Sequence, residues 1–162
     1  MTDAALTNVS RTPKKDPRDV INYEITMLMH CFEGLRRRHA DKNVSNLYIE
    51  GYLLHYRNLT EFFGASPPPP KGKRATDMSI HRSSTWGTRT LATAEVASVT
   101  SLAAPLHEKW KDHIGQQLHH CTEPRFTSKH SWPIADMHAD MCAVISAFRA
   151  LGAPATPSAT AL

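Results

Sequence analysis

Apolar residues that recur at alternating steps of three and four constrain this 162-residue chain more than any other feature of its sequence. The first run of this kind contains Ile21, Ile25, Leu28, Phe32 and Leu35. Because an α-helix turns once in about 3.6 residues, this spacing gives one continuous apolar stripe. Asp16 and Pro17 suit a helix start, and the basic residues from Arg36 to His39 suit the negative end of the helix dipole. The sequence therefore predicts a first helix between these two signals.

A second run follows after a short polar stretch. Its stripe contains Ile49, Tyr52, Leu53, Tyr56, Leu59 and Phe63. Asn43 and Ser45 are both good N-caps, so the helix is predicted to begin at one of them and to end at Phe63. Gly64 then stands where a left-handed C-cap would fall. Because the turn between the first two helices is short, we expect them to pack as an antiparallel hairpin.

Two more helices are predicted in the second half of the chain. Pro105 suits the first turn of a third helix, which Pro124 would end, and the alanines of residues 91–104 leave open a partly helical segment before it. The fourth helix is predicted to start near Trp132-Pro133, and Gly152 and Pro154 are expected to stop it. The two stripes contain Leu106, Trp110, Ile114, Leu118 and Cys121, and then Ile134, Met137, Met141, Ile145, Phe148 and Leu151.

Four amphipathic helices must cover one another's stripes, and the simplest closure is an all-α antiparallel bundle of four or five helices. We expect a disordered arm over residues 1–15, a single bundle domain over 16–152 and a disordered tail over 153–162. Inside the domain, residues 64–92 are predicted to be a Pro-rich basic connector, because four consecutive prolines at 67–70 cannot lie within a helix. No segment shows the two-residue alternation of a strand.

Several features indicate a cytoplasmic chain that makes no membrane contact. No apolar run approaches the ~20 residues that cross a bilayer. Residues 1–10 lack the basic and then apolar order of a secretory signal. The three cysteines, Cys31, Cys121 and Cys142, include no Cys-x-x-Cys pair, which argues against a disulfide framework and a thiolate zinc site.

The formal net charge of +4 comes entirely from the connector. This segment contains one acid, Asp77, and five basic residues: Lys71, Lys73, Arg74, Arg82 and Arg89. A basic loop can bind phosphates by Coulomb attraction and counterion release, which makes these residues candidates for nucleic-acid contact. The alternative is a solvated linker, which the sequence favours.

The most informative polar stretch lies in the second helix, where His55, Arg57 and Asn58 interrupt an apolar pattern. At 100° per residue, His55 and Asn58 share a face with Leu59. Arg57 projects elsewhere, beside Leu53, Leu54 and Glu61. Arg57 can pair with Glu61 at i,i+4 or with Glu50 two turns earlier. The residues are either a surface ion pair with a satisfied core histidine or a polar cluster at a helix seam.

A second polar stretch, His119 to Arg125, is predicted at the end of the third helix. Neighbouring histidines on a helix point about 100° apart and cannot share a metal, and no His-x-x-x-His or Glu-x-x-His pair occurs. Despite ten histidines, we therefore expect neither a metal nor a cofactor.

The segment from Arg125 to His130 resembles the Arg-x4-6-His pattern of HEPN-type helical-bundle proteins. Many members are metal-independent RNases or their partners in toxin–antitoxin and phage-defence systems. The resemblance implies that His130 or His120 acts as a base on a ribose 2′-hydroxyl while Arg125 steadies the phosphate. One departure is that Arg125 and His130 are predicted to lie in a loop after Pro124, whereas HEPN RNases place these residues at a helix start.

The chain also resembles a group of short bacterial helical proteins without an assigned activity. The shared segments are Leu54 to Phe63 and His120 to Arg125. From the residues themselves, we predict a non-catalytic interaction module in which His55, Arg57, Asn58, His120 and Arg125 form a polar network between the second and third helices. Such a network sets packing register and supports a homodimer or another protein partner. The alternative is a HEPN-like RNase or RNA-binding protein.

Overall fold

The computed structural model describes residues 17–37, 39–66, 78–81, 85–86, 89–118 and 131–151. In these ranges the chain forms four helices and two very short strands: α1 (Pro17–Arg36), α2 (Lys42–Gly64), β1 (Thr85–Trp86), β2 (Arg89–Thr90), α3 (Thr93–Leu118) and α5 (Ile134–Leu151). The predicted all-α antiparallel bundle is confirmed. The expected arm at 1–15 and tail at 153–162 lie outside the described residues.

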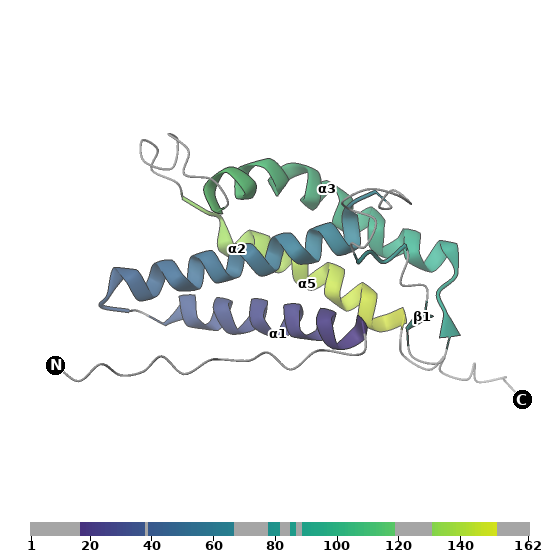
Figure 1. Ribbon diagram of the computed structural model, residues 1–162, viewed down its shortest axis with the longest axis horizontal. Helices are drawn as coiled ribbons and strands as arrows, with labels where there is room; N and C mark the ends of the chain where they lie inside the picture. The colour runs from purple at the N-terminus through teal and green to yellow at the C-terminus, as the bar shows by residue number, and fades with distance from the viewer. Residues whose placement is uncertain are drawn as a thin grey trace, which may run out of the picture.

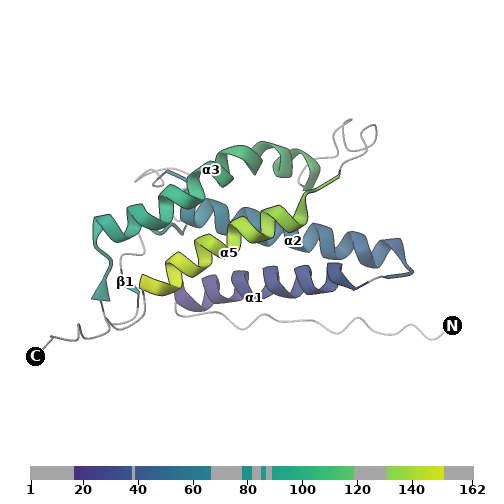
Figure 2. The same cartoon turned by 180° about the vertical axis from the view of Figure 1, so that it is seen from behind.

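The helices form two layers. α1, α2 and α3 lie side by side in Figure 1, and α5 crosses behind α2; Figure 2 shows α5 in front. The core fills the space between these layers. Its largest fully buried side chains include Ile25, Leu28, Tyr52, Leu53, Tyr56, Leu59, Phe63, Val99, Ile114, Met137 and Met141. Most of these residues belong to the predicted stripes, so apolar periodicity located the core. In the ranges that the structure describes, no helix combines the length and the apolar character needed to span a bilayer.

The α1–α2 hairpin forms as predicted, although its cap differs. Asp41 is the N-cap of α2, and its side chain accepts a hydrogen bond from the Asn43 N–H at 2.8 Å. Asn43 and Ser45, the expected caps, therefore lie inside the first turns. The helices approach closely near the turn, since a Cβ on Gly34 would overlap the ring of Tyr48.

The predicted left-handed C-cap at Gly64 is wrong. Gly64 is the last residue of α2, and its φ is not positive. Ala65 caps the helix in an extended conformation. The glycine is needed for a different reason. A Cβ on Gly64 would lie 2.6 Å from the backbone carbonyl carbon of Ala103 in α3, so only glycine allows this helix contact.

The predicted start of the third helix at Pro105 is also wrong, because α3 begins at Thr93 and carries Pro105 inside it. The Glu95 side chain accepts a hydrogen bond from the Ala92 N–H at 2.8 Å, which satisfies one of the free donors at the helix start. Proline removes one internal hydrogen bond and bends a helix. α3 is visibly bent in Figures 1 and 2.

The connector before α3 contains a feature that the sequence did not predict. β1 and β2 pair in antiparallel fashion, with Thr85 opposite Thr90 and Trp86 opposite Arg89. Two residues per strand are too few to show alternation, so the pattern offered no signal. Upstream, the Ile80 N–H donates to the Phe62 carbonyl at 3.0 Å, and Ile80 is fully buried. This part of the connector is therefore packed against the end of α2.

Candidate functional site

Three polar side chains meet between α1 and α2. Glu24 Oε2 accepts a hydrogen bond from His55 Nδ1 at 2.7 Å and a second from Asn58 Nδ2 at 3.0 Å. The side chains of His55 and Glu24 are only 9% and 15% exposed. An ionised carboxylate can only accept, so with Glu24 ionised this contact corresponds to a His55 tautomer that carries its proton on Nδ1. We call Glu24, His55 and Asn58 the hairpin cluster.

The neighbouring residues hold the histidine ring in place. The ring of Tyr23, one residue before Glu24, meets the His55 ring edge-on with centroids 5.9 Å apart. Two hydrogen bonds that converge on one carboxylate oxygen from successive turns of α2 fix the rotation of α1 against α2. The hairpin cluster is therefore suited to setting the packing register of the hairpin.

Arg57 precedes Asn58 in the sequence and binds a residue of its own helix. Its Nε and Nη2 both donate to Glu61 Oε1 at 3.1 Å, which is the i,i+4 pair predicted from the sequence. The two side chains are 29% and 33% exposed. Partly exposed pairs of this kind contribute at most about 1 kcal/mol, so Arg57 is a surface residue of the bundle and not a buried anchor.

A groove of about 220 Å³ opens between α1, α2 and the connector. Its lining residues are Val20, Ile21, Glu24, Asn58, Glu61, Phe62 and Met78. Two of these residues carry carboxylates, and none of the described lining residues is basic. This groove does not suit a phosphate group, because carboxylates repel anions at short range.

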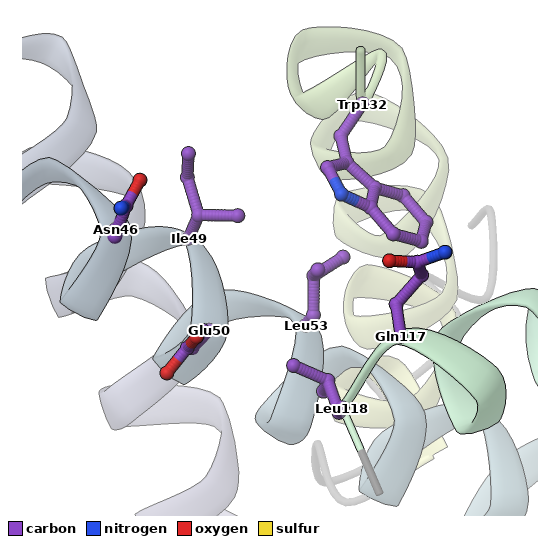
Figure 3. Close-up of a pocket in the computed structure, with 7 residues that line it drawn as sticks. All are labelled: Asn46, Ile49, Glu50, Leu53, Gln117, Leu118 and Trp132. Carbon is purple, nitrogen blue, oxygen red and sulfur yellow. The ribbon is translucent and has the colours of Figure 1, made fainter. Parts of the chain in front are cut away.

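A second groove, of about 290 Å³, lies between α2, the end of α3 and the segment that leads into α5. It is lined by Asn46, Ile49, Glu50, Leu53, Gln117, Leu118 and Trp132. Figure 3 shows Trp132 and Gln117 on one side of the groove and Ile49 and Leu53 on the other. The ring of His113 packs 4.8 Å from that of Trp132. Here too the described lining offers a carboxylate and no cation.

Further polar atoms are buried between α2 and α5. His138 stacks on Phe32 with ring centroids 3.5 Å apart. Its Nδ1 and the hydroxyls of Tyr52 and Tyr56 have no hydrogen-bond partner among the described residues. Burial lowers the pKa of His138, and the nearby Glu33 opposes this shift. Burial also raises the pKa of Tyr52 and of Tyr56 far above the ordinary value, so both remain protonated.

The predicted site residues fall into two groups. The structure brings His55 and Asn58 together, but their described partner is Glu24 of α1 and not a residue of α3. His120, Arg125 and His130 lie outside the described residues, so the expected network with the third helix and the RNase roles stay predictions. The same holds for four connector candidates: Lys71, Lys73, Arg74 and Arg82. Arg89 lies in β2, paired with Trp86.

Glu24 is the functional candidate that the sequence interpretation missed. Its signal was present, because Glu24 lies three residues after Ile21 and four before Leu28 on the buried stripe of α1. Within the described part of the chain, no group of three or more His, Cys, Asp or Glu side chains has a geometry that could bind a metal ion.

Comparison with known proteins found no matching family model, no similar curated protein and no similar solved structure. The resemblance to HEPN-type proteins therefore stays a hypothesis.

Proposed function

We propose that this chain is a non-catalytic interaction module, in which the hairpin cluster holds α1 and α2 in one register so that α2 presents a fixed surface to a protein partner. The observation that carries the proposal is the 2.7 Å contact between His55 Nδ1 and Glu24 Oε2, inside an almost completely buried pair. A histidine that acts on a substrate needs access to that substrate. His55 is held between two helices instead.

The charges around the described grooves support the same role. RNA binding depends on cations that neutralise phosphates. The grooves beside the hairpin cluster and beside Trp132 contain the carboxylates of Glu24, Glu61 and Glu50 and no described basic lining residue. Arg57, the basic residue nearest the hairpin cluster in sequence, binds Glu61.

The alternative is a metal-independent RNase or RNA-binding protein of the HEPN type, and it depends on His120, Arg125 and His130. The two functions are separated by incubating the full chain with single-stranded RNA beside the His120→Ala and His130→Ala variants. We expect no cleavage by any of the three proteins. Cleavage by the parent that either substitution abolishes would overturn the proposal in favour of the RNase. Cleavage that is unchanged in both variants would remove these histidines as catalysts.

RNA binding without cleavage needs a second measurement. Fluorescence anisotropy with a labelled RNA would report salt-dependent binding if the connector contacts phosphates. We expect none at physiological salt. Binding that is lost when Lys71, Lys73 and Arg74 are all replaced by alanine would instead identify the chain as an RNA-binding protein.

A further inference from the structure

α2 carries a second stripe at alternating spacings of three and four, on its solvent side. This outer stripe consists of Leu47, Glu50, Leu54, Arg57 and Glu61. Leu47 is 69% exposed and Leu54 is 40% exposed, and with Leu102 they are the large apolar side chains that the described surface exposes. The spacing is that of a helix seam, in which every third or fourth residue faces a partner helix.

Leu47 and Leu54 lie on the side of α2 opposite its buried face, and Glu50 and Glu61 lie at the edges of this side, where they also line the two grooves described above. Tyr52, Tyr56 and Phe63 face inward and are fully buried, and at 100° per residue Leu47 and Leu54 lie about 180° from them. α5 lies behind α2 in Figure 1, so the opposite side of α2 faces the viewer there. A groove of about 440 Å³ runs along this side, lined by Leu47, Glu50, Gly51, Leu54 and Leu118.

The order of charges along the outer stripe is self-complementary. Glu50 lies one turn before Leu54, and Arg57 lies one turn after it. We propose that a second copy of this chain packs against the outer stripe, with the two α2 helices antiparallel about a twofold axis at Leu54. In this arrangement Leu54 meets its own copy, and each Glu50 faces the Arg57 of the other chain. An isologous contact requires this kind of symmetry, because one surface must complement itself.

Arg57 has the hydrogen-bonding capacity that this contact needs. A guanidinium carries five N–H donors, and Nε and Nη2 both bind Glu61 Oε1 in the single chain. The guanidinium can therefore bridge Glu61 and a second carboxylate. The stripe is short, about 21 Å from Leu47 to Glu61 at 1.5 Å per residue. An interface of this length is small, so we expect a Kd in the micromolar range.

This inference rests on the proposed role as an interaction module and names its partner. The first test is light scattering on the full chain at concentrations up to roughly 500 µM. We expect the mass to rise to twice the 18.1 kDa of one chain. Leu54→Lys should return the mass to that of a single chain. Leu102→Lys is the matched control, because Leu102 is 45% exposed but lies on α3, and this variant should dimerise like the parent.

The second test exchanges the charges between chains. Glu50→Arg gives two facing positive positions in a homodimer, and Arg57→Glu gives two negative ones, so each variant alone should be monomeric. Mixed in equal amounts, the two variants should form a heterodimer, because each positive position then faces a negative one. In a parallel pairing the parent itself would place Glu50 against Glu50 and Arg57 against Arg57, so dimerisation of the parent together with this restoration supports the antiparallel register. Restoration on mixing also shows that both variants are folded.

A parent that remains a single chain at every concentration would overturn the inference. So would a dimer that survives Leu54→Lys, a dimer that Leu102→Lys also abolishes, or a charge-exchanged mixture that stays monomeric. These failures are distinct from failure of the proposed function, which the RNA cleavage and binding measurements decide. A monomer without RNase activity remains an interaction module with another partner.

Discussion

Replacing His55 by leucine would remove the shorter of the two described hydrogen bonds to the Glu24 carboxylate, in a position that is 15% exposed. Removing the donor of a hydrogen bond to a buried acceptor costs about 1–3 kcal/mol, and more where the acceptor is charged. Glu24 retains some contact with water and the bond from Asn58. We therefore expect His55→Leu to lower the free energy of unfolding by about 2–3 kcal/mol, which lowers Tm by roughly 4–12 °C in a domain of this size.

The double variant Glu24→Leu/His55→Leu should be more stable than His55→Leu alone. Replacing both partners of a buried hydrogen bond by apolar groups of similar shape is nearly neutral. The remaining loss of about 1 kcal/mol reflects the acceptor that Asn58 loses. Urea denaturation with linear extrapolation measures four chains: the parent, His55→Leu, Glu24→Leu and the double variant. Arg36→Ala is the control, because its partner Glu33 is well exposed and little loss is expected. A double variant as unstable as the sum of the two single changes would refute the reasoning.

Three other changes test packing and titration. Gly64→Ala should lower the free energy of unfolding by about 1–3 kcal/mol in the same assay, because its Cβ would meet the rigid backbone of Ala103. Gly115→Ala should raise the free energy of unfolding by about 0.5–1 kcal/mol, because a Cβ there has no neighbour within 4 Å. Equal effects at the two glycines would contradict this. Burial lowers the pKa of His138 from its ordinary value of 6.5. As the pH falls, the unfolded chain therefore binds a proton at this residue before the folded chain does. The stability that is present above pH 6.5 is lost as the pH falls through the folded-state pKa. His138→Phe keeps a ring on Phe32 and should flatten the decline of Tm between about pH 7 and 5; an unchanged slope would contradict the assignment.

The sequence predicted those parts of the fold that depend on one helix at a time. α1, α2 and α5 lie within a few residues of their expected bounds, because apolar periodicity and end signals are both local. Pro105 misled the interpretation of α3, because proline is a good first-turn residue. A helix can also carry proline in its interior, at a cost of about 3 kcal/mol. Buried residues on the turns before it, such as Val96 and Val99, offset that cost through packing, and no local signal reports this. The role of Gly64 was ambiguous for a related reason. Glycine is needed there because Ala103 approaches closely, and not because the backbone has a positive φ, and only the position of Ala103 shows this.

The hairpin cluster shows how far such prediction can extend. Both helices of a hairpin rise by about 1.5 Å per residue, so residues equally far from the turn lie opposite each other. Glu24 lies 12 residues before the end of α1 and His55 lies 13 residues after the start of α2, and both interrupt buried stripes. The sequence interpretation missed this contact, although the short turn and the two helix bounds were enough to deduce it. The predicted partners of His55 across the bundle, His120 and Arg125, are separated from α2 by a connector of more than twenty residues. Such a length leaves the rotation and register of the third helix open, so polar residues there cannot be assigned to a partner by counting. Contacts across a short turn are predictable from sequence, whereas those across a long connector require the coordinates.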